Sequence, residues 1–180
     1  AYAVGLWPFK DNFQTMPLQR PVRNEFWPYE EALISVLSAG LVGPGDKIGM
    51  TDKDLLMKTC RQDGVLLKPD RPATPIDAMY TDKTRPWTVS TESVHETGRT
   101  VYLAAFNLWP YRMFKPEVSM AELGITSEYV VYDYREQMVV ENRGAIDFGL
   151  MPQNDAFYYV LAPVLENDMA VIGETGKFVT

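Results

Sequence analysis

The chain has 180 residues, of which 46% are hydrophobic and 12% aromatic, and its 24 acidic residues outnumber 17 basic ones to give a net charge of −7. The apolar fraction excludes a disordered chain, and the acidic balance argues against nucleic acid, whose phosphates require clustered Lys and Arg. No apolar run reaches the length of about 18 residues that a membrane span needs.

The chain opens on an apolar stretch, residues 1–7, which is expected to form a strand. An ordinary N-terminus is polar and loose. Neither an initiator Met nor a basic leader-like region stands at this start. We therefore expect the sequence to begin in the middle of a larger fold.

A helix is predicted next, over residues 26–39. Pro28 suits the first turn, and Glu30 and Glu31 suit the positive end of the helix dipole. Gly40 follows at the position where helices commonly stop. The apolar residues of this helix are dense enough for burial on more than one side.

A second helix is predicted to open at residues 51–54, which are close to a capping box, and to stop at residues 63–64. A glycine-rich apolar segment, residues 41–49, lies between the two helices, and a short strand, residues 65–67, follows the second. Strand, helix, strand, helix, strand is the rhythm of an α/β fold.

From about residue 77 the chain is predicted to be all β, with one helical turn at residues 120–124. Gly, Pro, Asn and Asp turns separate the short apolar segments at a spacing typical of sandwiches. Both alternating faces of residues 100–107 are apolar, which indicates a central strand. The candidate strands are residues 87–90, 100–107, 129–135, 137–141, 145–149, 156–161 and 169–173.

Two aspartates are candidate functional residues. Asp11 directly follows the opening strand beside Lys10 and aromatic residues, where a sugar-processing carboxylate of a barrel would lie; alternatively, it is a loop residue that caps a turn. Asp46 follows a glycine-rich segment that lacks the ending of a phosphate-binding loop. It either lines a pocket, pairs with Lys47 or caps a turn.

Aromatic residues are dense near these aspartates. Their faces stack on sugar C–H surfaces, and they also fill cores well, which is the expectation for at least half of them. The group consists of Trp7, Phe9, Phe13, Trp27 and Tyr29.

The single histidine and the single cysteine have no supporting constellation around them. His95 lies in a polar stretch and is expected at an exposed loop or strand edge, and Cys60 is expected to be a small core residue. One cysteine excludes an intrachain disulfide, and one histidine excludes the His-rich zinc sites. No metal and no organic cofactor are indicated.

Three stretches of the first half carry a family resemblance. Residues 10–15 (K-D-N-F-Q-T) are similar to a W-D-M-F-Q-S segment, and residues 37–47 (L-S-A-G-L-V-G-P-G-D-K) to an L-S-G-G-P-V-Y-V-S-D-K strand. Residues 52–77 are similar to the helix, D-G-S-V-L-R turn and G-R-P-T-R-D segment that follow. These segments belong to the C-terminal part of the α-galactosidase and raffinose-synthase group of glycoside hydrolases, family 36 and its relatives.

The second half also resembles these enzymes, so the likeness extends over nearly the whole chain. Residues 103–107, 132–134 and 162–164 are similar to their G-V-F-N, Y-D-F and A-P-V segments. The resemblance implies an α+β fold in two parts: residues 1–76 are a remnant of the last βα units of a TIM (β/α)8 barrel. Residues 77–180 are a C-terminal antiparallel β-sandwich domain.

The implied function is that of a retaining glycosidase acting on α-linked sugars, with a galactoside as the expected carbohydrate substrate. The resemblance makes Asp11 either the acid/base or a residue that shapes the pocket, and the implied substrate-binding residues are Trp7, Lys10, Asp46 and Lys47. The family's catalytic pair lies in K-x-D and R-x-x-S-D segments. Because neither is convincingly present, we expect the chain to be inactive alone.

Two other interpretations stay open. Residues 81–180 would be a non-catalytic carbohydrate-binding or structural module, in which Trp87, Trp109 and Tyr111 supply an exposed aromatic row. A globular domain with no ligand of its own is the second. If the barrel interpretation holds, an open edge strand near Ala1 would favour self-association or a homo-oligomer.

Overall fold

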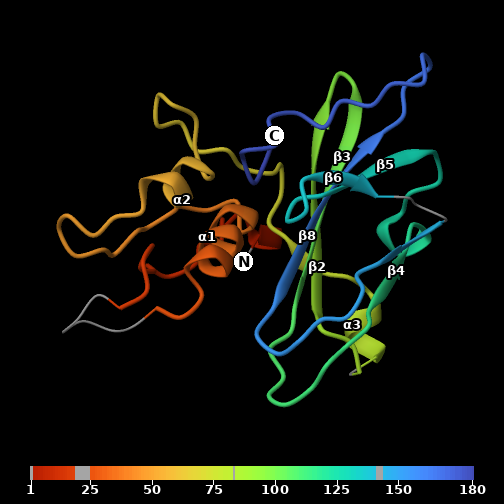
Figure 1. Cartoon of the computed structure of the whole chain (residues 1–180). Coiled ribbons are helices and arrows are strands. Elements are labelled where there is room, and N and C mark those ends of the chain that lie inside the picture. Colours follow the sequence, from red (N-terminus) through yellow and green to blue (C-terminus); the bar gives the residue numbers. More distant parts are fainter. Residues whose placement is uncertain (1, 19–24, 83, 141–143) are drawn as a thin grey trace. The chain divides into compact units, whose positions relative to one another are not determined.

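The computed structural model describes residues 2–18, 25–82, 84–140 and 144–180, and Figure 1 traces its elements along the chain. The chain divides into two compact units. Unit 1 consists of Ala1–Pro72 with Glu174–Thr180, and unit 2 of Ala73–Gly173. The last seven residues, which the sequence assigns to the β domain, are therefore grouped with unit 1.

The first helix of unit 1 is confirmed, with closer bounds than predicted. It is α1, Pro28–Leu37, and the two glutamates lie in its first turn. Leu33, Val36 and Leu37 are at most 2% exposed, as the dense apolar pattern predicts.

The second helix is confirmed only at its start. It is α2, Lys53–Met57, and the Asp52 side chain accepts a hydrogen bond from the Leu55 N–H at 3.0 Å, an N-cap. The predicted continuation to residue 63 is wrong, because the chain turns back at Cys60 and makes an antiparallel bridge to Leu66. Hairpin pairing of residues 59–67 thus replaces the last helical turns, and the strand predicted at 65–67 is reduced to this bridge.

The opening strand is also wrong. Residues Tyr2–Val4 form a short 3-10 helix, η1, which Gly5 ends with a positive φ of 77°. The strand predicted over 41–49 is reduced to one parallel bridge between Phe13 and Pro44, in which Phe13 is bonded to Gly43 and Gly45. A barrel remnant is thus not confirmed by the secondary structure of unit 1.

Unit 2 is a mostly antiparallel β structure with few helices, and Figure 1 shows β3 and β8 side by side in its large sheet. A six-stranded sheet has the order β1-β2-β3-β8-β5-β6, and a two-stranded sheet pairs β4 with β7. The elements are β1 Thr74–Pro75, α3 Ala78–Thr81, β2 Trp87–His95, β3 Gly98–Phe106, β4 Glu117–Ser119, η2 Ala121–Leu123, β5 Tyr129–Asp133, β6 Met138–Val140, β7 Ala145–Asp147 and β8 Ala156–Pro163.

One hydrophobic core joins the two sheets of unit 2. Leu103 of β3 and Leu161 of β8 pack in it together with Val118 of β4 and Ile146 of β7. Such packing between two sheets is the arrangement of a β-sandwich. The prediction that β3 is a central strand is confirmed, because it pairs with β2 on one side and with β8 on the other.

Most predicted strands of unit 2 are confirmed with altered bounds, and η2 confirms the predicted helical turn. The strand predicted at residues 169–173 is reduced to a single bridge between Val164 and Ala170. Residue 141, at the end of another predicted strand, lies outside the described residues. Among the residues described, no helix is long and apolar enough to cross a membrane.

Candidate functional site

Two segments that carry the candidate site residues run side by side in unit 1. A Cβ placed on Gly40 would lie 2.2 Å from the Pro8 carbonyl oxygen and 2.5 Å from the Phe9 Cβ. Three residues further along, the Phe13 N–H donates to the Gly43 carbonyl at 3.1 Å, and the Gly45 N–H donates to the Phe13 carbonyl at 2.7 Å. Residues 8–13 and 40–45 therefore lie parallel, and only glycine fits at position 40.

Asp46 joins the far ends of these two segments. Its carboxylate accepts hydrogen bonds from the Thr15 N–H at 2.7 Å and from the Thr15 hydroxyl at 2.8 Å. The same hydroxyl accepts a bond from the Asp52 N–H at 2.7 Å, next to the N-cap of α2. Asp46 is thus bonded to Thr15 at the end of the other segment, and Thr15 in turn is bonded to Asp52, which is itself the N-cap of α2. Lys47, beside it, is exposed and begins a turn to Met50.

Lys10 and Asp11 have different surroundings. Lys10 forms an ion pair with Glu31 in the first turn of α1. Asp11 is exposed, and its Oδ1 accepts a bond from the N–H of the next residue, Asn12, at 2.8 Å. Asp11 is open to a ligand, whereas Lys10 is held against the helix.

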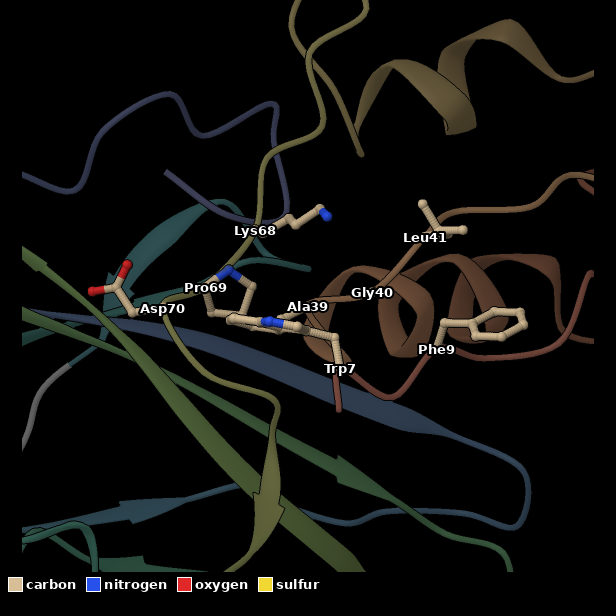
Figure 2. Close-up of a pocket in the computed structure, with 8 residues that line it drawn as sticks. All are labelled: Trp7, Phe9, Ala39, Gly40, Leu41, Lys68, Pro69 and Asp70. Carbon is tan, nitrogen blue, oxygen red and sulfur yellow. The ribbon is translucent and has the colours of Figure 1, made fainter. Parts of the chain in front are cut away.

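A cavity of about 570 Å³ lies at the start of the same two segments (Figure 2). Its volume lies within the range of about 300–1,000 Å³ that is typical of small-molecule sites. Figure 2 shows the indole of Trp7 next to Pro69 and Ala39. The lining residues are Trp7, Phe9, Ala39, Gly40, Leu41, Lys68, Pro69 and Asp70.

The cavity is mainly apolar, with two charged residues that the sequence does not single out. Lys68 and Asp70 come from the polar stretch after the hairpin, and no recognisable motif marks them. Trp7 is 54% exposed and makes an edge contact with Tyr2 at a centroid distance of 5.3 Å. An exposed indole beside one cation and one anion is suited to a ring-shaped ligand with polar substituents.

The predicted binding residues are thus divided between the two ends of the paired segments. Trp7 lines the cavity at the start, and Asp46 binds Thr15 at the end. Of the four predicted binding residues, Trp7 lines the cavity, and Lys10, Asp46 and Lys47 lie outside its lining.

Unit 2 carries the second group of candidate aromatics. Trp87 begins β2 and lies opposite Phe106, the last residue of β3. Trp109 follows three residues later, and Tyr111 is 96% exposed with a positive φ of 59°. The three exposed rings come from one end of the sheet, not from a row along its face.

Asn107, which is fully buried, holds this loop in place. Its side-chain amide donates to the carbonyls of Arg112 and Pro152, both at 2.8 Å, and to that of Met151 at 3.2 Å. Its side-chain oxygen accepts a bond from the Trp109 N–H at 3.1 Å. The exposed aromatics therefore project from a firmly bonded loop.

The exposed position predicted for His95 is confirmed, whereas the prediction that Cys60 lies in the core is wrong. His95 ends β2 and is exposed, and Cys60 is half-buried with its thiol 3.7 Å from the Leu56 carbonyl. Within the described ranges, no group of three or more His, Cys, Asp and Glu side chains is placed to hold a metal ion.

No protein-family model and no curated protein matches the sequence. Similarity appears in structure instead, to a GH27 β-L-arabinopyranosidase from Geobacillus stearothermophilus with a TM-score of 0.63 and 14% identity. That match covers 90% of this chain and 38% of the enzyme. A variant of the same enzyme in complex with arabinose matches with a TM-score of 0.62 and 15% identity, over 89% of this chain and 38% of that one.

A proposed α-galactosidase from Bacteroides fragilis is similar at 8% identity over 74% of this chain and 28% of that one. Its TM-score of 0.47 is too low to support an argument about the fold. The chain spans less than two-fifths of the length of the two Geobacillus structures. At these identities the likeness concerns the fold alone: the chain has a glycoside hydrolase-like fold.

Proposed function

We propose that this chain is the C-terminal part of a retaining glycosidase that acts on α-linked sugars and that it is inactive alone. The observation that carries the proposal is the likeness to a GH27 β-L-arabinopyranosidase over 90% of the chain at a TM-score of 0.63. In this proposal, residues 1–76 contribute the last βα units of a (β/α)8 barrel. Residues 77–180 form the C-terminal β-sandwich domain.

The parallel contact in unit 1 supports the barrel assignment. Neighbouring barrel strands are parallel, and residues 8–13 and 40–45 are paired in this sense through Phe13 and Pro44. The glycine at position 40 allows the two backbones to approach closely, because any Cβ at this position would overlap Pro8. Since α1 lies between the two segments in the sequence, the order of the elements is that of a βα unit, although the two segments share only the bridge between Phe13 and Pro44.

The substrate class follows from the resemblance and the fold together. α-D-Galactopyranosides and β-L-arabinopyranosides share the same ring stereochemistry and differ at the exocyclic carbon. A site for an α-galactoside and one for a β-L-arabinopyranoside therefore present the same contacts to the ring. We assign Trp7, Lys10, Asp46 and Lys47 to substrate binding, directly or through the segments that they position.

Asp11 is assigned to shaping the pocket, with the acid/base role as the alternative. A retaining mechanism requires two carboxyl groups about 5–5.5 Å apart, one of which attacks while the other donates a proton. In the proposed enzyme, the catalytic pair comes from earlier barrel strands. This is why the chain alone binds sugar weakly and hydrolyses none.

Binding of methyl α-D-galactopyranoside and methyl β-L-arabinopyranoside tests the proposal, with saturation-transfer NMR as the readout. We expect weak binding of both sugars that is lost in Trp7→Ala and reduced in Asp11→Asn. The matched control is Trp27→Ala, which removes a comparably exposed indole from outside the cavity. Binding that is unchanged in both Trp7→Ala and Asp11→Asn contradicts the assignment to unit 1.

A carbohydrate-binding module is the second candidate, favoured by the exposed Trp87, Trp109 and Tyr111 at one end of the sheet of unit 2. Exposed rings on a rigid support offer contact area at a low entropic cost. In this case Trp109→Ala abolishes sugar binding and Trp7→Ala leaves it unchanged. The same NMR titration therefore separates the two candidates.

Self-association stays a prediction, but it now rests on exposed apolar side chains and not on an open edge strand. The expected edge strand is absent at Tyr2–Val4, and Ala1 lies outside the described residues, but Val4 and Leu6 are 76% and 62% exposed. Exposed apolar side chains near one another favour association. Light scattering should show a mass that increases with concentration, whereas a stable monomer contradicts this expectation.

A further inference from the structure

A second cavity of unit 1 lies against the C-terminal segment and plays no part in the proposed function. Its volume is about 780 Å³. Residues 53–62, which include α2, form one wall, and Glu174 and Lys177 belong to the other. The lining residues are Lys53, Met57, Arg61, Gln62, Glu174 and Lys177.

The lysine in this wall is buried. Lys177 is 8% exposed, and its ammonium donates to the Met57 carbonyl at 2.6 Å. The nearest carboxylate, that of Glu174, is 3.9 Å away and 71% exposed. Among the residues that the structure describes, the ammonium has no other partner. A buried cation normally has a close counter-ion, since removing a charge from water is costly.

The cavity as a whole is positive within an acidic protein. Lys53, Arg61 and Lys177 oppose the single carboxylate of Glu174. Arg61 also binds Asp63 at 2.7 Å, which uses part of its donor capacity. The side chain of Lys53 has no hydrogen-bond or ion-pair partner within the described ranges. The positive charge stands out against the net −7 of the chain.

We propose that this cavity binds a phosphate group, which supplies Lys177 with a closer counter-ion than the exposed Glu174, 3.9 Å away. Phosphate oxygens accept several charge-assisted hydrogen bonds, and lysines are common phosphate ligands. Lys53 and Lys177 provide the charge, and Gln62 provides a neutral donor. The cavity exceeds the volume of an inorganic phosphate many times, so it accommodates either the free ion or a phosphorylated monosaccharide.

Calorimetric titration of the full chain tests this proposal at constant ionic strength. The ligands are inorganic phosphate and galactose 6-phosphate, with galactose and sodium chloride as controls. We expect saturable binding of at least one phosphate compound at this cavity and no effect of chloride. Tighter binding of galactose 6-phosphate identifies a phosphorylated sugar as the ligand, and equal or weaker binding identifies the free ion. Absence of phosphate binding overturns the proposal.

Two substitutions with opposite expected effects on phosphate affinity test whether the phosphate binds in this cavity. Lys53→Gln should weaken phosphate binding about 5- to 10-fold, because it removes one charge-assisted donor. Glu174→Gln should tighten it several-fold, because it removes the carboxylate that repels the anion. Both side chains are exposed, so the folded state is expected to tolerate the changes.

Matched controls have the same charge change in unit 2. Lys115→Gln and Glu136→Gln alter exposed residues outside the cavity and should leave the dissociation constant unchanged. If both variants of the cavity behave like their controls, phosphate binds elsewhere or only through the net charge, and the proposal is wrong. The sugar titrations with Trp7→Ala are independent of this outcome, so the proposed function is tested separately.

Discussion

The two units differ in how their backbone groups are hydrogen-bonded and in how far their apolar side chains are buried. In unit 2 continuous ladders hold the sheet together, such as the nine-residue register of β2 and β3 from Trp87 to His95. In unit 1 the described β pairing is limited to isolated bridges, such as that between Phe13 and Pro44. The N-terminal segment of unit 1 leaves Tyr2, Val4, Leu6, Trp7 and Phe9 between 48% and 76% exposed.

The contacts within each unit therefore stabilise the two units to different degrees. A sheet with paired strands and one shared core has the interactions that an independent domain needs. Unit 1 has isolated bridges in place of ladders, and its N-terminal segment leaves large apolar side chains exposed, so fewer contacts stabilise it. We therefore expect unit 2 to be the more stable of the two and unit 1 to respond more strongly to changes in its few tight contacts.

The largest effect is expected from Asn107→Leu in unit 2. The change removes all three amide hydrogen bonds to the loop carbonyls and places an apolar side chain among them, so the free energy of unfolding should fall by about 3 kcal/mol. Urea denaturation measures this loss. Asn167→Ala, whose side chain accepts one exposed bond from Met169 at 3.3 Å, should cost less than about 0.5 kcal/mol. Equal effects would mean that the loop is not a fixed part of unit 2.

Gly40→Ala is expected to destabilise unit 1 by about 2–3 kcal/mol, because its Cβ would overlap the Pro8 carbonyl. Gly43→Ala, in the same segment, would place its Cβ 3.8 Å from Asn12, an ordinary contact. Hydrogen exchange should therefore show faster opening of unit 1 in the first variant alone. If the two variants open alike, the parallel contact of residues 8–13 with 40–45 is not tight.

Thr15→Val should cost about 1.5–2 kcal/mol, because it removes the hydroxyl between Asp46 and the Asp52 N–H and keeps the side-chain shape. The measurement is again the denaturant midpoint. The exposed Thr51 supplies the control, Thr51→Val, which should change stability by less than about 0.5 kcal/mol. An unchanged midpoint in Thr15→Val would mean that the hydroxyl bonds to Asp46 and Asp52 do not stabilise unit 1.

The smallest expected effect concerns alkaline stability of unit 2. Burial raises the pKa of Tyr134 to about 12, from an ordinary value of 10.0. Because the folded state holds this proton more tightly, the contribution is complete below about pH 10 and is lost as the pH rises towards 12. Tyr134→Phe should therefore lose less stability than the wild type over this interval, whereas the exposed Tyr80→Phe should follow the wild type. Parallel pH profiles for all three proteins would contradict the assignment.

The β half of the fold was readable from the sequence because its strands carry strong local signals. Apolar residues on both faces of residues 100–107 mark a central strand, and turn residues bound most of its neighbours. Short elements such as Thr74–Pro75 and Glu117–Ser119 carry too few residues for a pattern, and they are formed by pairing with distant strands. Local propensity cannot identify them.

Unit 1 was harder to predict for a related reason. Residues 1–7 are apolar enough for a strand, but a strand needs a partner, and without one the segment turns at Gly5. Likewise, the tie between Thr15 and Asp46 depends on a tertiary contact across 31 residues. The sequence identifies Asp11 and Asp46 as candidate residues. It does not show that the two have different surroundings, or that Lys68 lines the cavity.

The central proposal is that this chain, whose fold is similar to part of a GH27 arabinopyranosidase, hydrolyses no glycoside alone. Incubation of the purified chain with 4-nitrophenyl α-D-galactopyranoside and 4-nitrophenyl β-L-arabinopyranoside tests it most directly. We expect no release of nitrophenol above that of buffer. Turnover that disappears in Asp11→Ala would contradict both the inactivity of the chain and the assignment of Asp11 to shaping the pocket.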